Sequence, residues 1–153
     1  PIIMDYACNH KGYNIDTTRT YVIGKLPNDL EDNYKKILEI YSLLKELVKP
    51  GITCNEIYET VLNMINKMNL SDNFMGYKDS RVNFIGHGIG LEIDEYPPVA
   101  PRVNTIIEKN MVIAIEPKLF FPPIGAVGIE DTFLVTENGI EDFAKLDTGI
   151  IKI

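Results

Sequence analysis

Five side chains could together bind metal ions, because four carry carboxylates and one carries an imidazole. They are Asp5, Asp16, His87, Glu116 and Glu130. Glu116 and Glu130 interrupt stretches that otherwise have the composition of buried strands, where an ionised carboxylate without a cation is very costly. An oxygen-rich set with one nitrogen suits divalent first-row ions better than a structural zinc ion, which prefers Cys and His. Because four carboxylates balance the charge of two divalent ions, the pattern predicts a centre with two metal ions.

His87 lies between two glycines, and a third glycine, Gly90, follows shortly after. Glycine adopts backbone angles that other residues avoid, so the run is a poor helix and a poor strand and favours a fixed loop. Taken alone, this pattern fits a histidine with a structural role equally well. The interpretation of His87 as a ligand depends on the four carboxylates.

Two strands joined by a polar turn are expected to carry the first two carboxylates. Residues 2–6 and 13–23 have strand-like composition, and residues 8–12 form the turn. Side chains alternate along a strand, so Asp16 and Thr18 share one face, where Thr18 could support a metal-binding carboxylate. The alternative interpretation is the solvated face of an edge strand.

Two amphipathic helices are predicted in the middle of the chain. The first begins at Asn28, a residue type that favours the N-cap position, and ends before Pro50. The second follows a capping box formed by Thr53 and Glu56 and extends to Met68. Both segments carry apolar residues at spacings of three and four, which predicts one buried face for each helix.

Two further strands are expected near the C-terminal end, at 111–117 and 127–135, and each contains one of the two glutamates. The stretch 111–117 is so apolar that both of its faces are predicted to be covered. Strands at both ends of the chain with helices between them predict an α+β domain, with helices packed on a mostly antiparallel sheet.

Composition narrows the classes of protein that the chain could represent. A length of 153 residues with 45% hydrophobic content suits one domain, and a net charge of −7 argues against a nucleic-acid surface or an anionic membrane partner. Two cysteines are too few for a disulfide framework, and no apolar run approaches the roughly 18 residues of a membrane span. We therefore expect free thiols and a cytoplasmic location. Because Pro1 leads directly into an apolar run, we interpret the chain as the interior of a longer protein, entered in mid-domain.

Four short motifs resemble those of the pita-bread metallopeptidases, the family of aminopeptidase P, Xaa-Pro dipeptidase and methionine aminopeptidase. The first contains Asp5 and, eleven residues later, Asp16. The second is Gly-His-Gly-Ile-Gly-Leu-Glu at 86–92, the third is Val-Ile-Ala-Ile-Glu-Pro at 112–117, and the fourth is Gly-Ile-Glu-Asp at 128–131. All five metal ligands of the family fall on matching residues of this chain.

This resemblance implies the creatinase/aminopeptidase (pita-bread) fold, a curved antiparallel sheet with helices packed outside. Residues 1–153 would form part of a catalytic metallopeptidase domain whose N-terminal part is missing. The implied metal ligands are Asp5, Asp16, His87, Glu116 and Glu130. The implied cofactors are two divalent ions, with manganese favoured and cobalt, zinc or iron as alternatives. The substrate would be a peptide, and the full-length protein would be a homodimer.

Within the family, two details are similar to the proline-specific peptidases. One is the run Asp16-Thr17-Thr18-Arg19-Thr20, and the other is the short interval between Glu116 and Glu130. The resemblance implies hydrolysis of a peptide bond next to proline, with a metal-bridging hydroxide as the nucleophile. Glu116 would handle the proton, and His87 would share the catalytic role.

Four positions depart from the family pattern. Asp94 stands where relatives carry a substrate-contacting histidine, and Gly128 stands where proline-specific relatives carry arginine. Lys118 and Ala7 each replace a glycine of the family pattern. An ionised aspartate accepts hydrogen bonds but cannot donate them, so Asp94 is expected to hold a proton or to bind a cationic group of the substrate. The departures leave two alternatives: a homologue that has lost or altered its catalysis, and a different metal-dependent amide hydrolase or lyase.

Metal affinity and activity should fall in acid, because protons compete with metal ions for carboxylate and imidazole ligands. Metal binding and turnover by the full-length protein, measured from pH 8 downwards, test this prediction. Activity that stays unchanged well below pH 5 would contradict the predicted centre.

Overall fold

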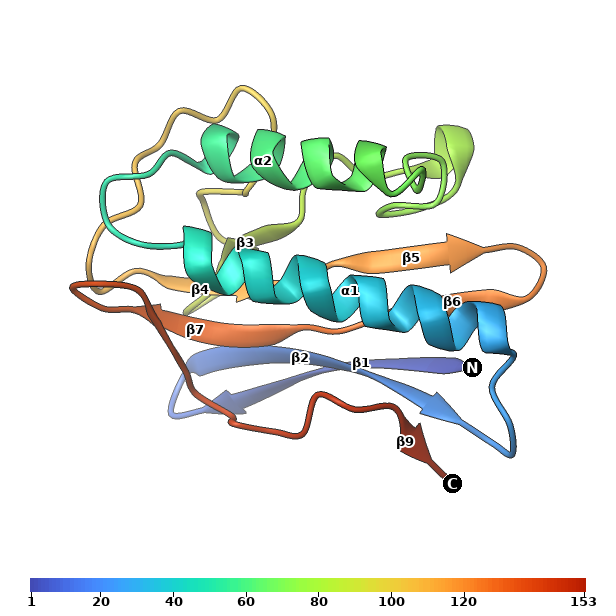
Figure 1. Ribbon diagram of the computed structural model, residues 1–153. Helices are drawn as coiled ribbons and strands as arrows, with labels where there is room; N and C mark the ends of the chain where they lie inside the picture. The colour runs from blue at the N-terminus through green and yellow to red at the C-terminus, as the bar shows by residue number, and fades with distance from the viewer.

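Two helices lie across one side of a group of short strands in the computed structural model, which describes residues 1–153 (Figure 1). The elements in chain order are β1 (Ile2–His10), β2 (Tyr13–Val22), α1 (Asn28–Leu47), α2 (Cys54–Lys67), a short 3-10 turn (Lys78–Ser80), β3 (Gly86–Gly88), β4 (Val112–Ile115), β5 (Lys118–Phe121), β6 (Gly125–Gly128), β7 (Asp131–Val135), β8 (Ile140–Asp142) and β9 (Ile151–Lys152). The α+β prediction is confirmed.

The strands form three small sheets rather than one continuous sheet. Their orders are β1-β2-β9, β3-β4-β7-β8 and β5-β6, and every pair is antiparallel except β2 with β9. An isolated bridge between Thr18 and Glu130 joins the first sheet to the segment that separates β6 from β7. This bridge brings the N-terminal hairpin and the C-terminal strands together at Glu130, a predicted ligand, and at Thr18, the residue predicted to support a ligand.

The first two strands form a longer hairpin than the sequence indicates. Strand β1 continues to His10, and only Lys11 and Gly12 turn the chain, with φ values of 53° and 90°. The register pairs Asp5 with Thr18. Asp5 and Asp16 therefore reach the site from neighbouring strands.

The structure corrects the predicted N-cap of the first helix and confirms the capping box of the second. Helix α1 has Pro27 as its N-cap, and the Pro27 carbonyl accepts hydrogen bonds from the amides of Leu30 and Glu31. Asn28 is therefore the first helical residue, and its prediction as the cap is wrong. The capping box of α2 is present, because Thr53 Oγ1 accepts from the Glu56 amide at 3.2 Å while the Glu56 side chain accepts from the Thr53 amide.

The apolar faces of both helices pack on the strands to form one core. Ile37 and Ile57 from the helices are fully buried, as are Ile113 of β4 and Phe133 of β7. Ile113, like the two residues that follow it, is buried, which confirms that both faces of this strand are covered. Because β4 is fixed in the core, the residue after it, Glu116, has a defined position.

A buried ion pair joins β2 to β7. Nη2 of Arg19 donates to Oδ1 of Asp131 at 2.8 Å, and the hydroxyl of Tyr41 donates to Oδ2 of Asp131 at 2.6 Å. Nη1 of Arg19 also donates to the carbonyls of Thr18 and Glu130, both at 2.8 Å. Burial raises the pKa of Asp131, while the hydrogen bonds from Arg19 and Tyr41 oppose that rise. The pair fixes the backbone on both sides of the Thr18–Glu130 bridge.

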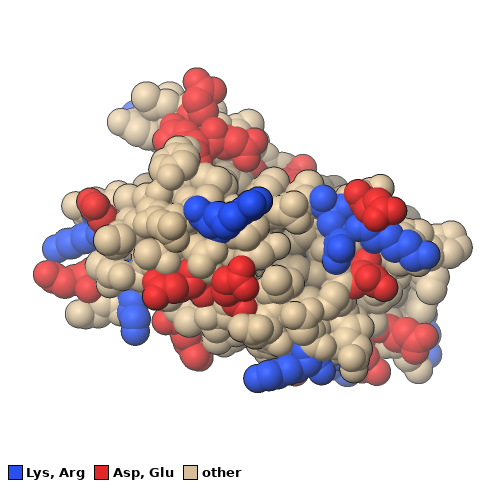
Figure 2. Space-filling view, turned by 90° about the horizontal axis from the view of Figure 1, so that it is seen from above, with Lys and Arg blue, Asp and Glu red and all other residues tan.

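Charges on the face seen in Figure 2 form small groups in which acidic and basic side chains are mixed. Neither helix combines the length and the apolar character that a membrane crossing requires. The expectation that the protein has no nucleic-acid or membrane partner stays a prediction.

Replacing Arg19 by methionine should lower the free energy of unfolding by about 3–5 kcal/mol, because Asp131 would remain buried without its cation. Urea-induced unfolding of the full-length protein measures this loss. The control, Lys35→Met, breaks the exposed Asp32–Lys35 ion pair and should leave the unfolding midpoint in place. Equal effects of the two substitutions would show that the buried pair is unimportant.

Candidate metal centre

His87 lies in strand β3, and the prediction of a loop at this position is wrong. Its two glycine neighbours are required by close backbone approach, not by unusual φ angles. A Cβ atom on Gly86 would lie 2.4 Å from the carbonyl oxygen of Ala114, and one on Gly88 would lie 2.8 Å from that of Tyr96. The two glycines therefore allow β3 to lie close against its neighbours, with His87 buried between them at 5% exposure.

The hydrogen-bond partner of one ring nitrogen indicates the tautomer of His87. Its Nδ1 lies 2.9 Å from the carbonyl oxygen of Gly88, which can only accept a hydrogen bond, so Nδ1 carries the hydrogen. In the neutral ring Nε2 then has a free lone pair. Nε2 lies 3.8 Å from Oε1 of Glu116 and 3.8 Å from Oε1 of Glu130. Because all three of these atoms are acceptors, a cation is the group that fits between them.

Asp16, His87 and Glu130 form a group whose ligand atoms all lie within 4.8 Å of one another. Three buried ligand groups, two carboxylates and one imidazole, fit a divalent first-row ion. Burial, together with the negative charges of Glu130 and Asp5, raises the pKa of Asp16 to about 6. The carboxylates thus disfavour each other's charge, which a bound cation would relieve.

Hydroxyl groups hold two of these residues in place. Thr18 donates from Oγ1 to Oε2 of Glu130 at 2.7 Å, so it supports a predicted ligand, although not the one on its own strand. Asp16 is held through its backbone, because its amide donates to Oγ1 of Thr132 at 2.8 Å. The sequence does not predict the role of Thr132, because Asp16 and Thr132 are 116 residues apart and no local pattern links them.

Lys118 lies inside the acidic cluster. Its Nζ donates to Oδ2 of Asp5 at 2.9 Å, to Oε2 of Glu116 at 2.9 Å and to Oε2 of Glu130 at 3.1 Å. Burial opposes the charge of Lys118, but the negative charges of Glu130 and Glu116 outweigh it and raise its pKa. A signal was present in the sequence, because residues two apart in extended backbone share a face, which directs Lys118 toward the side of Glu116.

Gly128 lies directly opposite Lys118 in the pairing of β5 with β6. A Cβ atom on Gly128 would lie 2.5 Å from Cγ and 3.1 Å from Cβ of Lys118. These are the first atoms of the lysine side chain and cannot move away freely. The two departures from the family pattern therefore belong together, since the glycine provides the space that the lysine fills.

Asp94 reaches the edge of the cluster from the loop that follows β3. Its Oδ1 lies 3.5 Å from Nε2 of His87, and its side chain is 77% exposed. The predicted substrate-binding residue is thus adjacent to the predicted ligands and accessible from solvent.

Two pockets flank the cluster and share one wall, Phe84. The first, of about 550 Å³, has Glu116 and Lys118 on one side and apolar residues that include Phe120 and Pro122 on the other. The second, of about 360 Å³, contains His87 and Asp94.

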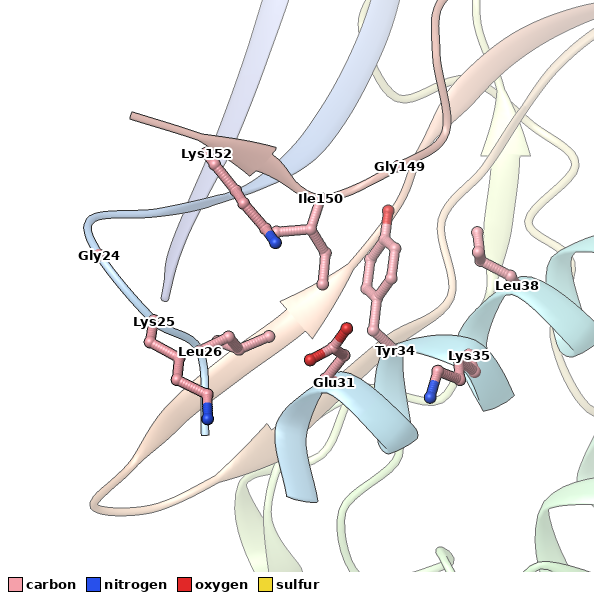
Figure 3. Close-up of a pocket in the computed structure, with 10 residues that line it drawn as sticks. All are labelled: Gly24, Lys25, Leu26, Glu31, Tyr34, Lys35, Leu38, Gly149, Ile150 and Lys152. Atoms are coloured by element: carbon pink, nitrogen blue, oxygen red, sulfur yellow. The ribbon is translucent and has the colours of Figure 1, made fainter. Parts of the chain in front are cut away.

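Another pocket, of about 380 Å³, lies at the start of α1 beside β9 (Figure 3). Its wall combines the side chains of Tyr34 and Ile150 with those of Lys25, Lys35 and Lys152. It contains none of the predicted ligands.

The fold is that of the prolidases and related aminopeptidases. The prolidase of Pyrococcus horikoshii OT3 superimposes with a TM-score of 0.87 at 35% identity, over 97% of this chain and 41% of that one. The X-Pro aminopeptidase of Thermotoga maritima superimposes with a TM-score of 0.90 over 99% of this chain and 41% of that one, but its 23% identity supports the fold alone. The prediction of the pita-bread fold is confirmed.

The family follows from the sequence comparison. Residues 1–137 match metallopeptidase family M24, and the chain belongs to this family. The Xaa-Pro dipeptidase of Pyrococcus furiosus is 34% identical over 98% of this chain and 41% of its own length. The chain thus spans about 41% of the relatives that it matches. The predicted resemblance to the proline-specific branch is confirmed, while the roles of individual site residues stay predictions.

Replacing Thr18 by valine keeps the shape of the side chain but removes a hydrogen bond from the buried Glu130 carboxylate. We expect the free energy of unfolding to fall on the order of 1–3 kcal/mol, because the carboxylate loses a donor that water cannot replace. Denaturant unfolding of the metal-free full-length protein measures the change. Thr60→Val removes a hydroxyl that donates to a backbone carbonyl on the exposed side of α2, and serves as the matched control. Equal losses in the two variants would contradict a special role for Thr18.

Proposed function

We propose that the full-length protein is a metal-dependent hydrolase that cleaves peptide bonds next to proline. Membership of metallopeptidase family M24 supports the reaction class. Similarity to proteins named Xaa-Pro dipeptidase supports the substrate class. Because the chain spans only about 41% of these relatives, the activity is proposed for the whole protein.

The observation that carries the proposal is the buried Nε2 lone pair of His87 facing two carboxylate oxygens. Asp16, His87 and Glu130 would hold a divalent ion at this position. Such an ion would polarise the carbonyl of the scissile bond and lower the pKa of a bound water. We favour manganese, since carboxylate-rich sets suit it, with cobalt, zinc and iron as the alternatives.

Glu116 is the residue proposed to handle the proton. Its Oε2 accepts from Lys118, so Oε1, which faces His87, is the atom free to take a proton. The carboxylate is buried and lines the first pocket, so a proton at Oε1 would be shielded from bulk water and close to the substrate.

The two pockets suggest how the substrate would lie. Phe84, Phe120 and Pro122 give the first pocket apolar walls that suit a proline ring. Asp94 gives the second pocket an exposed carboxylate that can accept hydrogen bonds from an ammonium group. We propose that Asp94 binds the free α-amine of the residue before proline, so that the scissile bond lies between the two pockets.

We also propose a cytoplasmic location and a homodimer for the full-length protein. The location is supported by two free thiols, exposed Cys8 and buried Cys54, which suit a reducing compartment. The dimer is supported only by the family resemblance. Light scattering on the full-length protein tests the dimer.

A second candidate is a metal-dependent hydrolase of a non-peptide amide. The presence of Asp94 and Lys118 at the site favours it, because both change the charge that a substrate would meet. It becomes the better proposal if metal-bound protein cleaves none of a panel of Xaa-Pro dipeptides and tripeptides.

Replacing Asp94 by asparagine should raise KM roughly tenfold for Xaa-Pro dipeptides with a free amine, because a charge-assisted hydrogen bond is lost. For N-acetylated peptides KM should change little, since they carry no ammonium group. Steady-state kinetics of the full-length protein with Mn²⁺ or Co²⁺ measure both values.

The matched control is Glu92→Gln, which removes the same charge from the same loop. A KM that rises equally for free and acetylated peptides would contradict amine recognition by Asp94.

A further inference from the structure

We propose that the ammonium group of Lys118 takes the place of one of the two expected metal ions, so that the centre binds a single divalent ion per chain. This inference rests on the proposed metal-dependent function, but it concerns the number of ions and not the reaction. It differs from the expectation of a two-ion centre, which stays a prediction.

The first support is the way in which the two glutamates divide their oxygens. Glu116 and Glu130 each direct Oε2 to Nζ of Lys118, at 2.9 Å and 3.1 Å. Each directs Oε1 toward Nε2 of His87, at 3.8 Å. The acidic cluster therefore has two halves, one around His87 and one around Lys118, and the two glutamates are shared between them.

The second support is that only the half around His87 offers a free set of ligands. Asp16, His87 and Glu130 bring their ligand atoms within 4.8 Å of one another there. In the other half, Nζ of Lys118 lies within hydrogen-bond distance of Asp5, Glu116 and Glu130 and fills the point that their oxygens surround. A second ion would have to bind these oxygens at about 2.0–2.2 Å, where it would meet the ammonium group directly.

The third support is packing, which holds Lys118 in the cluster. Its side chain is 10% exposed, and its Cγ and Cβ atoms lie 2.5 and 3.1 Å from the position that a Cβ atom on Gly128 would take. Lys118 is therefore a fixed structural part of the centre.

The charges of the cluster agree with one ion. Asp5, Asp16, Glu116 and Glu130 carry four negative charges, and one ammonium group with one divalent ion supplies three positive charges. Asp94 adds a fifth carboxylate at the edge of the cluster, but its side chain is 77% exposed and can be hydrated. The remaining negative charge falls on the side of Asp5, whose side chain is 49% exposed and can be hydrated. Lys118 thus acts as a positioning residue that neutralises and orients Glu116 and Glu130.

Metal titration of the metal-free full-length protein tests the inference. Calorimetry with Mn²⁺ should give one ion per chain, and the electron paramagnetic resonance spectrum should be that of isolated Mn²⁺ without exchange coupling. In the Lys118→Ala variant, the vacated oxygens should bind a second ion, so that the stoichiometry becomes two and the coupled spectrum of a manganese pair appears.

Lys109→Ala is the matched control, because Lys109 is half-exposed and pairs with Glu137 away from the cluster. It should keep a stoichiometry of one. If Lys118→Ala does not fold, the wild-type stoichiometry decides on its own.

Two ions per wild-type chain, or none, would overturn the inference. A Lys118→Ala variant that folds and still binds one ion would overturn it as well. Cleavage of Xaa-Pro peptides is measured separately on the same samples. One bound ion without any cleavage would contradict the proposed function and leave the inference standing. Two bound ions with cleavage would contradict the inference and leave the proposed function standing.

Discussion

Several carboxylates can be buried at one point only where positive charge meets them, and this requirement governs the centre of the protein. Glu130 illustrates it, since it is 1% exposed and takes hydrogen bonds from Thr18 and Lys118 on one oxygen while the other faces His87. Burial raises the pKa of Glu130, and Lys118 opposes that rise. The groups around Glu130 each offset the cost of burying its negative charge.

The fold serves the same requirement at longer range. The bridge between Thr18 and Glu130 brings strands from the two ends of the chain together, and the ion pair of Arg19 with Asp131 fixes the backbone beside it. The helices do not contribute ligands but provide the apolar core on which β4 and β7 are held. Precise placement of the carboxylates therefore depends on residues that never contact a substrate.

The sequence predicts the parts of the structure that depend on local patterns. Helix periodicity, the capping box at Thr53 and the spacing of the five ligands are all of this kind. What it does not predict depends on distant neighbours. The glycines beside His87 are needed because the carbonyls of Ala114 and Tyr96 approach them, and the contact of Lys118 with Asp5 joins opposite ends of the chain. The sequence places Lys118 on the side of Glu116, but only the fold brings Asp5 and Glu130 to the same point.

The close packing of Lys118 against Gly128 also restricts the order in which this sequence can change. A side chain introduced at Gly128 first would collide with the lysine stem, so Lys118 has to be lost before Gly128 can be replaced. A chain that has lost the lysine but gained no other cation would carry its carboxylates uncompensated unless metal ions occupied both halves. A form without the lysine would therefore gain more stability from bound metal ions than the present chain does.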